Sequence, residues 1–192
     1  MNNLYGTAIL AAGLVLSNVV HAHFGDHSNA SLEAGLLHPF SGLDHMLAMI
    51  AVGAWAAQAG GRALLAIPAA FMGAMVLGAA LAVEGVVVPM AHMGIAGSVL
   101  VAGLLVALAV RSPLEWALPM IAMLAIFHGY AHGSEMPQFS SPGRYFAGFL
   151  MATAVLHSCG VAAAVALRGH MTALRAGGAV VSVTGFLLLL AA

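Results

Sequence analysis

The chain of 192 residues contains no lysine, a single cysteine and few charged residues of either sign. Without lysine it has no Walker A phosphate-binding loop, so the chain is not an ATP-driven pump by itself. The lone Cys159 excludes an internal disulfide framework and a metal site built from paired cysteines. A net charge of -1 argues against nucleic acid or an anionic surface as a partner, because either would call for a basic patch.

Charge is scarce because the chain is strongly apolar. Hydrophobic residues make up 62% of it and charged residues 6%, whereas a soluble domain typically carries about 25% charged residues. This composition predicts an all-α integral membrane protein, with the lipid bilayer as its surroundings. Six segments have close to the roughly 20 residues that span a bilayer, with Gly, Pro or charge between them. They cover about residues 40–57, 63–83, 90–110, 114–132, 145–167 and 173–190.

An additional apolar stretch, residues 4–20, precedes these six segments. It ends in Val20-His21-Ala22, a small-residue pattern of the kind that signal peptidase cuts after. We therefore expect residues 1–22 to be a signal peptide and residues 23–192 to form the mature six-helix domain with short loops. The first residues include no Lys or Arg, so an uncleaved additional helix is the alternative.

The placement of arginine predicts the orientation, since short cytoplasmic loops are enriched in Lys and Arg. If the six segments alternate, one side carries Arg62, Arg111, Arg168 and Arg175. The opposite side carries Asp26, Glu33, Glu84 and Glu135, with Arg144 and Glu115 as exceptions to the pattern. The prediction is a multi-pass protein of the bacterial inner membrane, with these arginines in the cytoplasm and the mature N-terminus in the periplasm.

Two histidine-rich stretches interrupt the apolar segments, HPFSGLDH at residues 38–45 and FHGYAHGSE at residues 127–135. An ionisable group costs roughly 2.5 to 3.5 kcal/mol within a membrane, so several at one depth indicate a function. Imidazoles and carboxylates bind divalent transition metals, and they also carry protons. The predicted topology brings a set of such groups to one depth near the outer face, namely Asp44, His45, His92, His128 and His132.

The spacing within the second stretch supports a binding site. His128 and His132 are four residues apart, so they lie on one face of a helix and are able to hold one ion. Gly129 and Gly133 form a pair of small residues one position around the helix, which predicts close approach by another helix.

In the first stretch, His38 precedes Pro39 at the expected start of the first mature helix. His45 is seven residues further on and is expected along the same face. His157 lies near the middle of the fifth segment, too deep for the outer set. It is either a second station on a path through the membrane or a packing residue.

The two stretches and the mature start HFGDH resemble the HupE/UreJ family of nickel permeases, and the resemblance covers essentially the whole chain. It implies six mature helices and delivery of nickel to hydrogenase or urease maturation, with cobalt as an alternative cargo. It implies roles in nickel handling for His38, Asp44, His45, His128, His132 and Glu135. It also implies metal capture by the processed N-terminus, here His23, Asp26 and His27.

Under this interpretation the nickel or cobalt ion is the transported substrate, and we expect no permanently bound cofactor. Two alternatives come from other classes of protein. A membrane accessory protein would hold the ion at the outer face without moving it, and would need no second polar station such as His157. An intramembrane metalloenzyme is disfavoured because Gly129 follows His128, so the zinc protease signature HExxH is absent. We therefore expect no enzyme activity.

Overall fold

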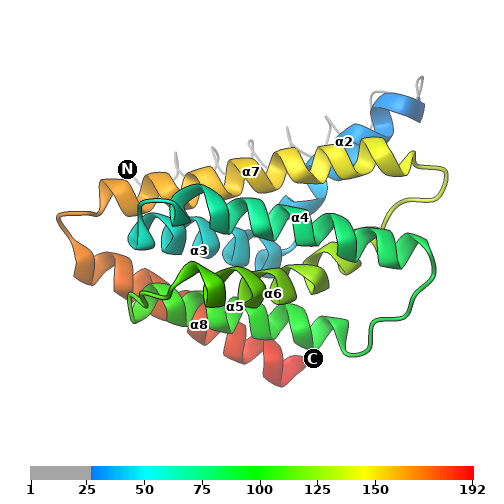
Figure 1. Ribbon diagram of the computed structural model, residues 1–192. Helices are drawn as coiled ribbons and strands as arrows, with labels where there is room; N and C mark the ends of the chain where they lie inside the picture. The colour runs from blue at the N-terminus through cyan, green and yellow to red at the C-terminus, as the bar shows by residue number, and fades with distance from the viewer. Residues whose placement is uncertain (1–26) are drawn as a thin grey trace, which may run out of the picture.

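The computed structural model describes the backbone of residues 27–192 and the side chains from residue 30 onward, and every regular element in this range is an α-helix (Figure 1). The helices are α2 (His27–Ser41), α3 (Leu43–Ala59), α4 (Ala63–Val83), α5 (Ala91–Ala107), α6 (Leu114–Ser134), α7 (Pro142–Ala166) and α8 (Met171–Ala191). The last five coincide with predicted segments to within a few residues. The predicted signal peptide, residues 1–22, lies outside the described residues.

Four of these helices, α4, α6, α7 and α8, are long and apolar enough to cross a membrane, and the bent pair α2 and α3 together meets the same criterion. Helix α5 is also apolar, but its 17 residues are fewer than the roughly 20 of a perpendicular span. From α3 to α8 successive helices run in alternate directions, as the short connections predict (Figure 1).

The first predicted helix is wrong at its start. Instead of one helix beginning near Pro39, there are two, α2 and α3, which meet at Gly42 with a bend of 83°. Pro39 lies in the last turn of α2, and Gly42 has an extended backbone with φ -107° and ψ 123°. Ser41 closes the turn by donating its hydroxyl hydrogen to the His38 carbonyl at 2.6 Å. His38 and His45 therefore lie on two helices rather than along one face.

Helix α2 was missed because its sequence, HSNASLEAGLLHPFS, is too polar to suggest a span. It packs on α7 through small buried residues at every fourth position, Ser31, Gly35 and Pro39. A Cβ added at Gly35 would lie 2.1 Å from the Tyr145 carbonyl oxygen, so the two backbones are in close contact. The Ser31 hydroxyl also accepts a hydrogen bond from the Ser141 amide at 3.0 Å.

The close approach predicted for Gly129 and Gly133 is confirmed. A Cβ at Gly129 would lie 2.0 Å from the Met75 carbonyl oxygen, and one at Gly133 would lie 2.5 Å from the Ala79 carbonyl oxygen. Both contacts are with α4, so the glycines of the FHGYAHGSE stretch seat α6 directly on the α4 backbone. This contact places His128 and His132 in the interior of the bundle, where neither is exposed.

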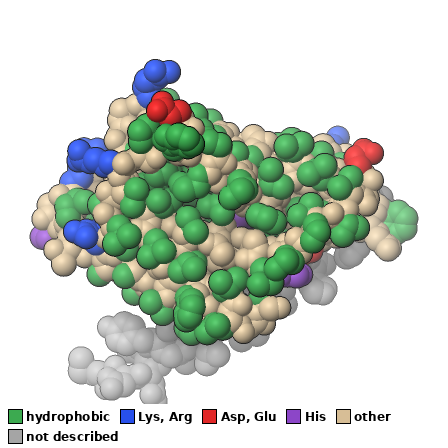
Figure 2. Space-filling model, turned by 60° about the horizontal axis from the view of Figure 1, so that its bottom comes forward, with side chains coloured by type: hydrophobic (Ala, Val, Ile, Leu, Met, Phe, Trp, Pro, Cys, Tyr) green, Lys and Arg blue, Asp and Glu red, His purple; other side chains and the backbone are tan. Residues whose placement is uncertain are grey.

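The interior of the bundle is filled by large side chains from α3, α4, α6 and α7. Trp55, Phe71, Tyr145 and Phe149 are each at most 1% exposed. Apolar side chains also cover much of the outer surface, while basic side chains gather at one end (Figure 2). That end holds the loops 60–62, 108–113 and 167–170, and the loops 84–90 and 135–141 lie at the other end (Figure 1).

Candidate metal centre

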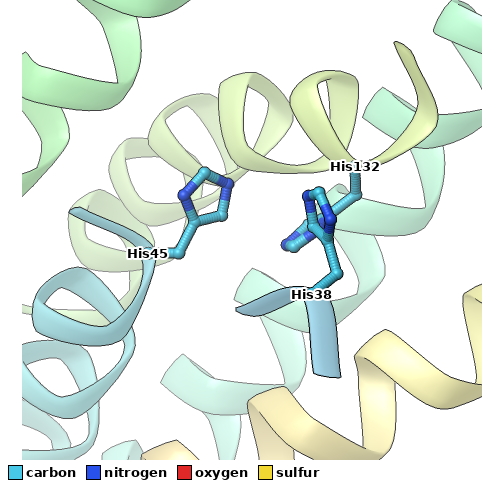
Figure 3. A group of neighbouring side chains, drawn as sticks. All are labelled: His38, His45 and His132. Carbon is cyan, nitrogen blue, oxygen red and sulfur yellow. The ribbon is translucent and has the colours of Figure 1, made fainter. Parts of the chain in front are cut away.

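The bend between α2 and α3 faces the end of α6, and three imidazoles meet there. His38 comes from α2, His45 from α3 and His132 from α6 (Figure 3). Each offers a ligand atom, and these atoms all lie within 4.8 Å of one another. Because one ion can touch only atoms that surround a common point, this grouping is a candidate metal centre.

His128 extends the cluster inward by one turn of α6. Its ring centroid is 5.0 Å from that of His45, and His45 is in turn 4.8 Å from His132. His38 is 4.7 Å from His132 and 6.1 Å from His45. The structure thus brings together four of the predicted histidines from three helices.

Asp44 orients the imidazole of His45. Its Oδ1 atom lies 2.8 Å from His45 Nδ1 and accepts a second hydrogen bond, also 2.8 Å, from the His45 backbone amide. Since an ionised carboxylate only accepts hydrogen bonds, Nδ1 carries the hydrogen and Nε2 carries the lone pair. His45 Nε2 is buried without a hydrogen-bond partner in the described part of the chain. A carboxylate that holds a histidine in this way is a common support for metal ligands.

Ser98 of α5 orients His128 in the same way, through a hydrogen bond to one ring nitrogen. The Ser98 hydroxyl donates its single hydrogen to the Ile95 carbonyl at 2.6 Å. Its contact of 2.5 Å with His128 Nε2 therefore requires the imidazole N–H to donate. The lone pair of His128 then resides on Nδ1, which is buried without a partner among residues 27–192.

Glu135 and His38 form the outer rim of the cluster. The Glu135 Oε2 atom lies 3.3 Å from His38 Nε2, and the two side chains are 52% and 17% exposed. Asp44 is also accessible, with 34% of its side chain exposed. Two carboxylates thus stand at the accessible edge, with the buried imidazoles behind them, so an arriving cation meets negative charge first.

Aromatic side chains form the wall of the cluster. Phe149 of α7 stacks on His132, with ring centroids 4.7 Å apart and planes 7° from parallel. Tyr145 contacts His38 at 6.0 Å, and Phe71 of α4 contacts His128 at 5.6 Å. Both ring nitrogens of His132 are buried without a hydrogen-bond partner within the described range. This wall packs directly against the imidazole rings and holds them in place.

Sequence reasoning missed Ser98, Phe71, Tyr145 and Phe149 as parts of this site. A serine in an apolar helix is a weak signal, and aromatic residues in such helices usually only pack. One pattern was available: Tyr145 and Phe149 are four residues apart and so share a face of α7. The sequence does not show, however, that this face turns toward the histidines.

Other predicted residues lie elsewhere. His92 is exposed near the start of α5 and, within the described range, has no ring contact, hydrogen bond or ion pair with the cluster. His157 is buried in α7, where its Nδ1 atom lies against the Met49 carbonyl oxygen of α3, and it has no direct ring contact with the cluster histidines in the described range. His23 and Asp26 lie outside the described residues, as does the side chain of His27.

The arrangement is suited to divalent transition metals. Neutral imidazoles whose nitrogen atoms are grouped this closely are ligands for nickel, cobalt, zinc or copper ions. Four neutral histidines supply no countercharge to a dication, so Asp44 and Glu135 are the groups that offset its charge.

Fold and site together define a multi-pass helical membrane protein with a buried histidine cluster near one end of its bundle. The chain belongs to the HupE / UreJ protein family, which matches residues 10–188. It is 47% identical over 178 residues to protein HupE of Rhizobium leguminosarum bv. viciae, a match that covers 91% of this chain and 92% of that protein. No solved structure matches the chain.

Proposed function

We propose that the protein carries a divalent transition metal ion, nickel first and cobalt as the alternative, into the cytoplasm for hydrogenase or urease maturation. The observation that carries this proposal is the grouping of His38, His45 and His132 with ligand atoms within 4.8 Å. Imidazole ligands suit nickel, and Asp44 and Glu135 at the rim supply negative charge. Membership of the HupE / UreJ family supports the same function.

The proposed arrangement has six membrane spans, α3 to α8, in the bacterial inner membrane, with α2 bent against α7 at the outer side. The end of the bundle with loops 60–62, 108–113 and 167–170 then faces the cytoplasm, because these loops contain Arg62, Arg111 and Arg168. The histidine cluster lies near the opposite end, at the periplasmic side. Helix α5 is short, and a locally thinner bilayer accommodates such a span.

Inward transport of a dication needs no coupled energy source in a cell with a negative interior. Each charge gains about 2.3 kcal/mol per 100 mV, so two charges gain roughly 4.6 kcal/mol, enough for about a thousandfold accumulation. The protein has to replace the water shell of the ion without trapping it. Four imidazoles and two carboxylates at different depths offer such stepwise replacement.

The residues before α2 add two parts to the proposal. Residues 1–22 form a signal peptide whose removal leaves His23 as the periplasmic N-terminus. His23 and Asp26 then lie just before α2 and His27 is its first residue, whereas His38 lies near the other end of the same helix. In this arrangement His23, Asp26 and His27 capture ions from the periplasm and pass them to the rim.

Uptake of radioactive nickel into vesicles that contain only the purified protein tests the proposal. With a potential that is negative inside, nickel should accumulate, and His45→Ala should reduce the rate to that of empty vesicles. Competition by excess cobalt measures the preference between the two ions. Tight nickel binding by the purified protein without uptake would instead identify a static accessory protein.

A further inference from the structure

His157 of α7 is a further buried imidazole with a free lone pair, and it lies outside the histidine cluster. It is 3% exposed, and its Nδ1 atom lies 2.7 Å from the Met49 carbonyl oxygen of α3. A carbonyl only accepts hydrogen bonds, so Nδ1 carries the hydrogen and Nε2 the lone pair. His157 Nε2 is buried and has no hydrogen-bond partner in the described part of the chain. A backbone carbonyl that fixes one ring nitrogen leaves the other poised as a ligand.

A stripe of residues on α7 connects His157 with the metal centre. Tyr145, Phe149, Thr153 and His157 are spaced four apart, so they share one helical face, and none is more than 3% exposed. Phe149 stacks on His132 of the metal centre. At 1.5 Å per residue, His157 lies about 12 Å further along α7 than Phe149. Its imidazole is therefore at a distinct depth, nearer the middle of the bundle.

Helix α4 supplies the facing side of this connection. Phe71 contacts both His128, at 5.6 Å, and His157, at 5.2 Å. One turn further along α4, the Met75 sulfur accepts a hydrogen bond from the Thr153 hydroxyl at 3.9 Å. Between the two histidines there is thus one aromatic ring that touches both, and next to it a hydroxyl and a thioether. Oxygen and sulfur atoms of this kind are additional ligands for a partly dehydrated transition metal ion.

We propose that His157 is a second binding station, which takes a divalent transition metal ion through its Nε2 atom after the ion leaves the outer histidine cluster. Thr153 and Met75 line the passage to it, and Phe71 separates the two stations. This inference rests on the proposed transport function. It adds a site at a distinct depth. The lone pair on His157 Nε2 is buried there, and no hydrogen bond within the described residues uses it.

Two substitutions separate a ligand from a packing residue. His157→Asn places an amide N–H near the position of Nδ1, so it keeps the bond to the Met49 carbonyl and loses the Nε2 lone pair. His157→Gln places its amide near the position of Nε2 and loses that bond. If His157 is a ligand, His157→Asn should lower the maximal nickel uptake rate at least tenfold and change the half-saturating concentration less than twofold. His157→Gln should keep more of the maximal rate.

A matched control is Ser158→Ala, because Ser158 is exposed and its hydroxyl bonds, among the described residues, only to the Ala154 carbonyl of its own helix. It should transport at the wild-type rate. The second station would be overturned if His157→Asn, present at normal abundance, took up nickel at the wild-type rate. It would also be overturned if the maximal uptake rate fell further in His157→Gln than in His157→Asn. Failure of the wild-type protein itself to transport would instead overturn the proposed function.

If the His157 variant proteins do not accumulate in the membrane, the number of nickel ions bound by each chain tests the second station instead. Equilibrium dialysis of nickel should use protein in which His23 and His27 are replaced by alanine, so that the N-terminus contributes no site. We expect two ions per chain at saturation, and one after His45→Ala is added. A single ion before that change would overturn the second station.

Discussion

The histidines of the cluster differ in what holds each ring. Polar side chains contact three of the rings: Asp44 binds His45, Ser98 binds His128 and Glu135 faces His38. The ring of His132 instead stacks on the face of Phe149. Asp44 and Ser98 each bind one ring nitrogen of their histidine and leave its other nitrogen without a hydrogen-bond partner in the described part of the chain. His132 is the exception, because neither nitrogen has a hydrogen-bond partner among the described residues.

This geometry predicts that His45 and His128 act as one unit. His45→Ala and His128→Ala should each abolish nickel uptake, and the double variant should be no worse, because coordinating residues that act together are not additive. Asp44→Asn keeps the size of the side chain but removes a charge that offsets the dication, so its uptake should also fall about 10- to 100-fold. The measurement is initial uptake in vesicles with equal amounts of each protein.

The amount of each variant in the membrane serves as the control, since a folding defect would also reduce uptake. Near wild-type transport by these variants at normal abundance would show that the histidines are structural and that the metal-centre assignment is wrong.

At the scale of helices, the break between α2 and α3 brings the residues of the metal centre together. The bend of 83° turns His38 back toward His45, which a continuous helix would carry about two turns away. A break also leaves backbone groups without partners in their own helix, and within a membrane such irregular backbone occurs only where protein or a polar cavity surrounds it. Here His132 of α6 contacts the imidazoles of His38 and His45 on either side of the break, and Tyr145 of α7 contacts His38.

Gly42 at the break should be sensitive to the smallest added side chain. A Cβ there would lie 2.7 Å from Asp44 Oδ1 and 3.0 Å from His45 Nδ1. Its backbone angles suit alanine, so the effect of Gly42→Ala comes from displacing the Asp44 and His45 pair. We expect the half-saturating nickel concentration to rise about tenfold, equivalent to about 1.4 kcal/mol.

Gly73→Ala is the matched control for Gly42→Ala, because a Cβ at Gly73 of α4 would have no atom of another described helix or loop within 4 Å. It should leave transport and abundance unchanged. If the half-saturating nickel concentration were the same in the two variants, the position of the Asp44 and His45 pair would not matter for nickel capture.

At the scale of the whole molecule, the two ends of the bundle differ in charge, and the metal centre belongs to one of them. The loop 135–141 follows the end of α6, whose last turn carries His132, whereas the loops with Arg62, Arg111 and Arg168 lie at the other end (Figure 1). The direction of transport therefore depends on which end faces the cytoplasm.

Cysteine labelling in intact cells tests this orientation. In a Cys159→Ala background, which removes the single exposed thiol, an impermeant thiol reagent should label Glu84→Cys and Glu135→Cys. Arg62→Cys and Arg111→Cys should react only after the cells are opened, because short arginine loops remain in the cytoplasm. The reverse pattern would place the cluster at the cytoplasmic side and contradict uptake as the direction of transport.

The sequence by itself determined the all-helical architecture, most helix limits and the residue types of the site. Long apolar segments interrupted by Gly, Pro and charge leave few alternatives to packed helices, because a backbone surrounded by lipid must satisfy its own hydrogen bonds. The spacing of His128 and His132 and the closely packed glycines beside them also followed from the helical period alone.

Only the tertiary structure decided the bend at Gly42 and the contacts that Ser98 and Phe149 make with the cluster, and among the described residues it shows no contact between His92 and the cluster. Sequence periodicity states which residues share a face of one helix, but not the direction in which that face turns in the bundle. That rotation is set by contacts between helices, such as Gly129 against Met75 and Gly35 against Tyr145. The close contacts bring four imidazoles from three helices together, although their order along the chain does not require it.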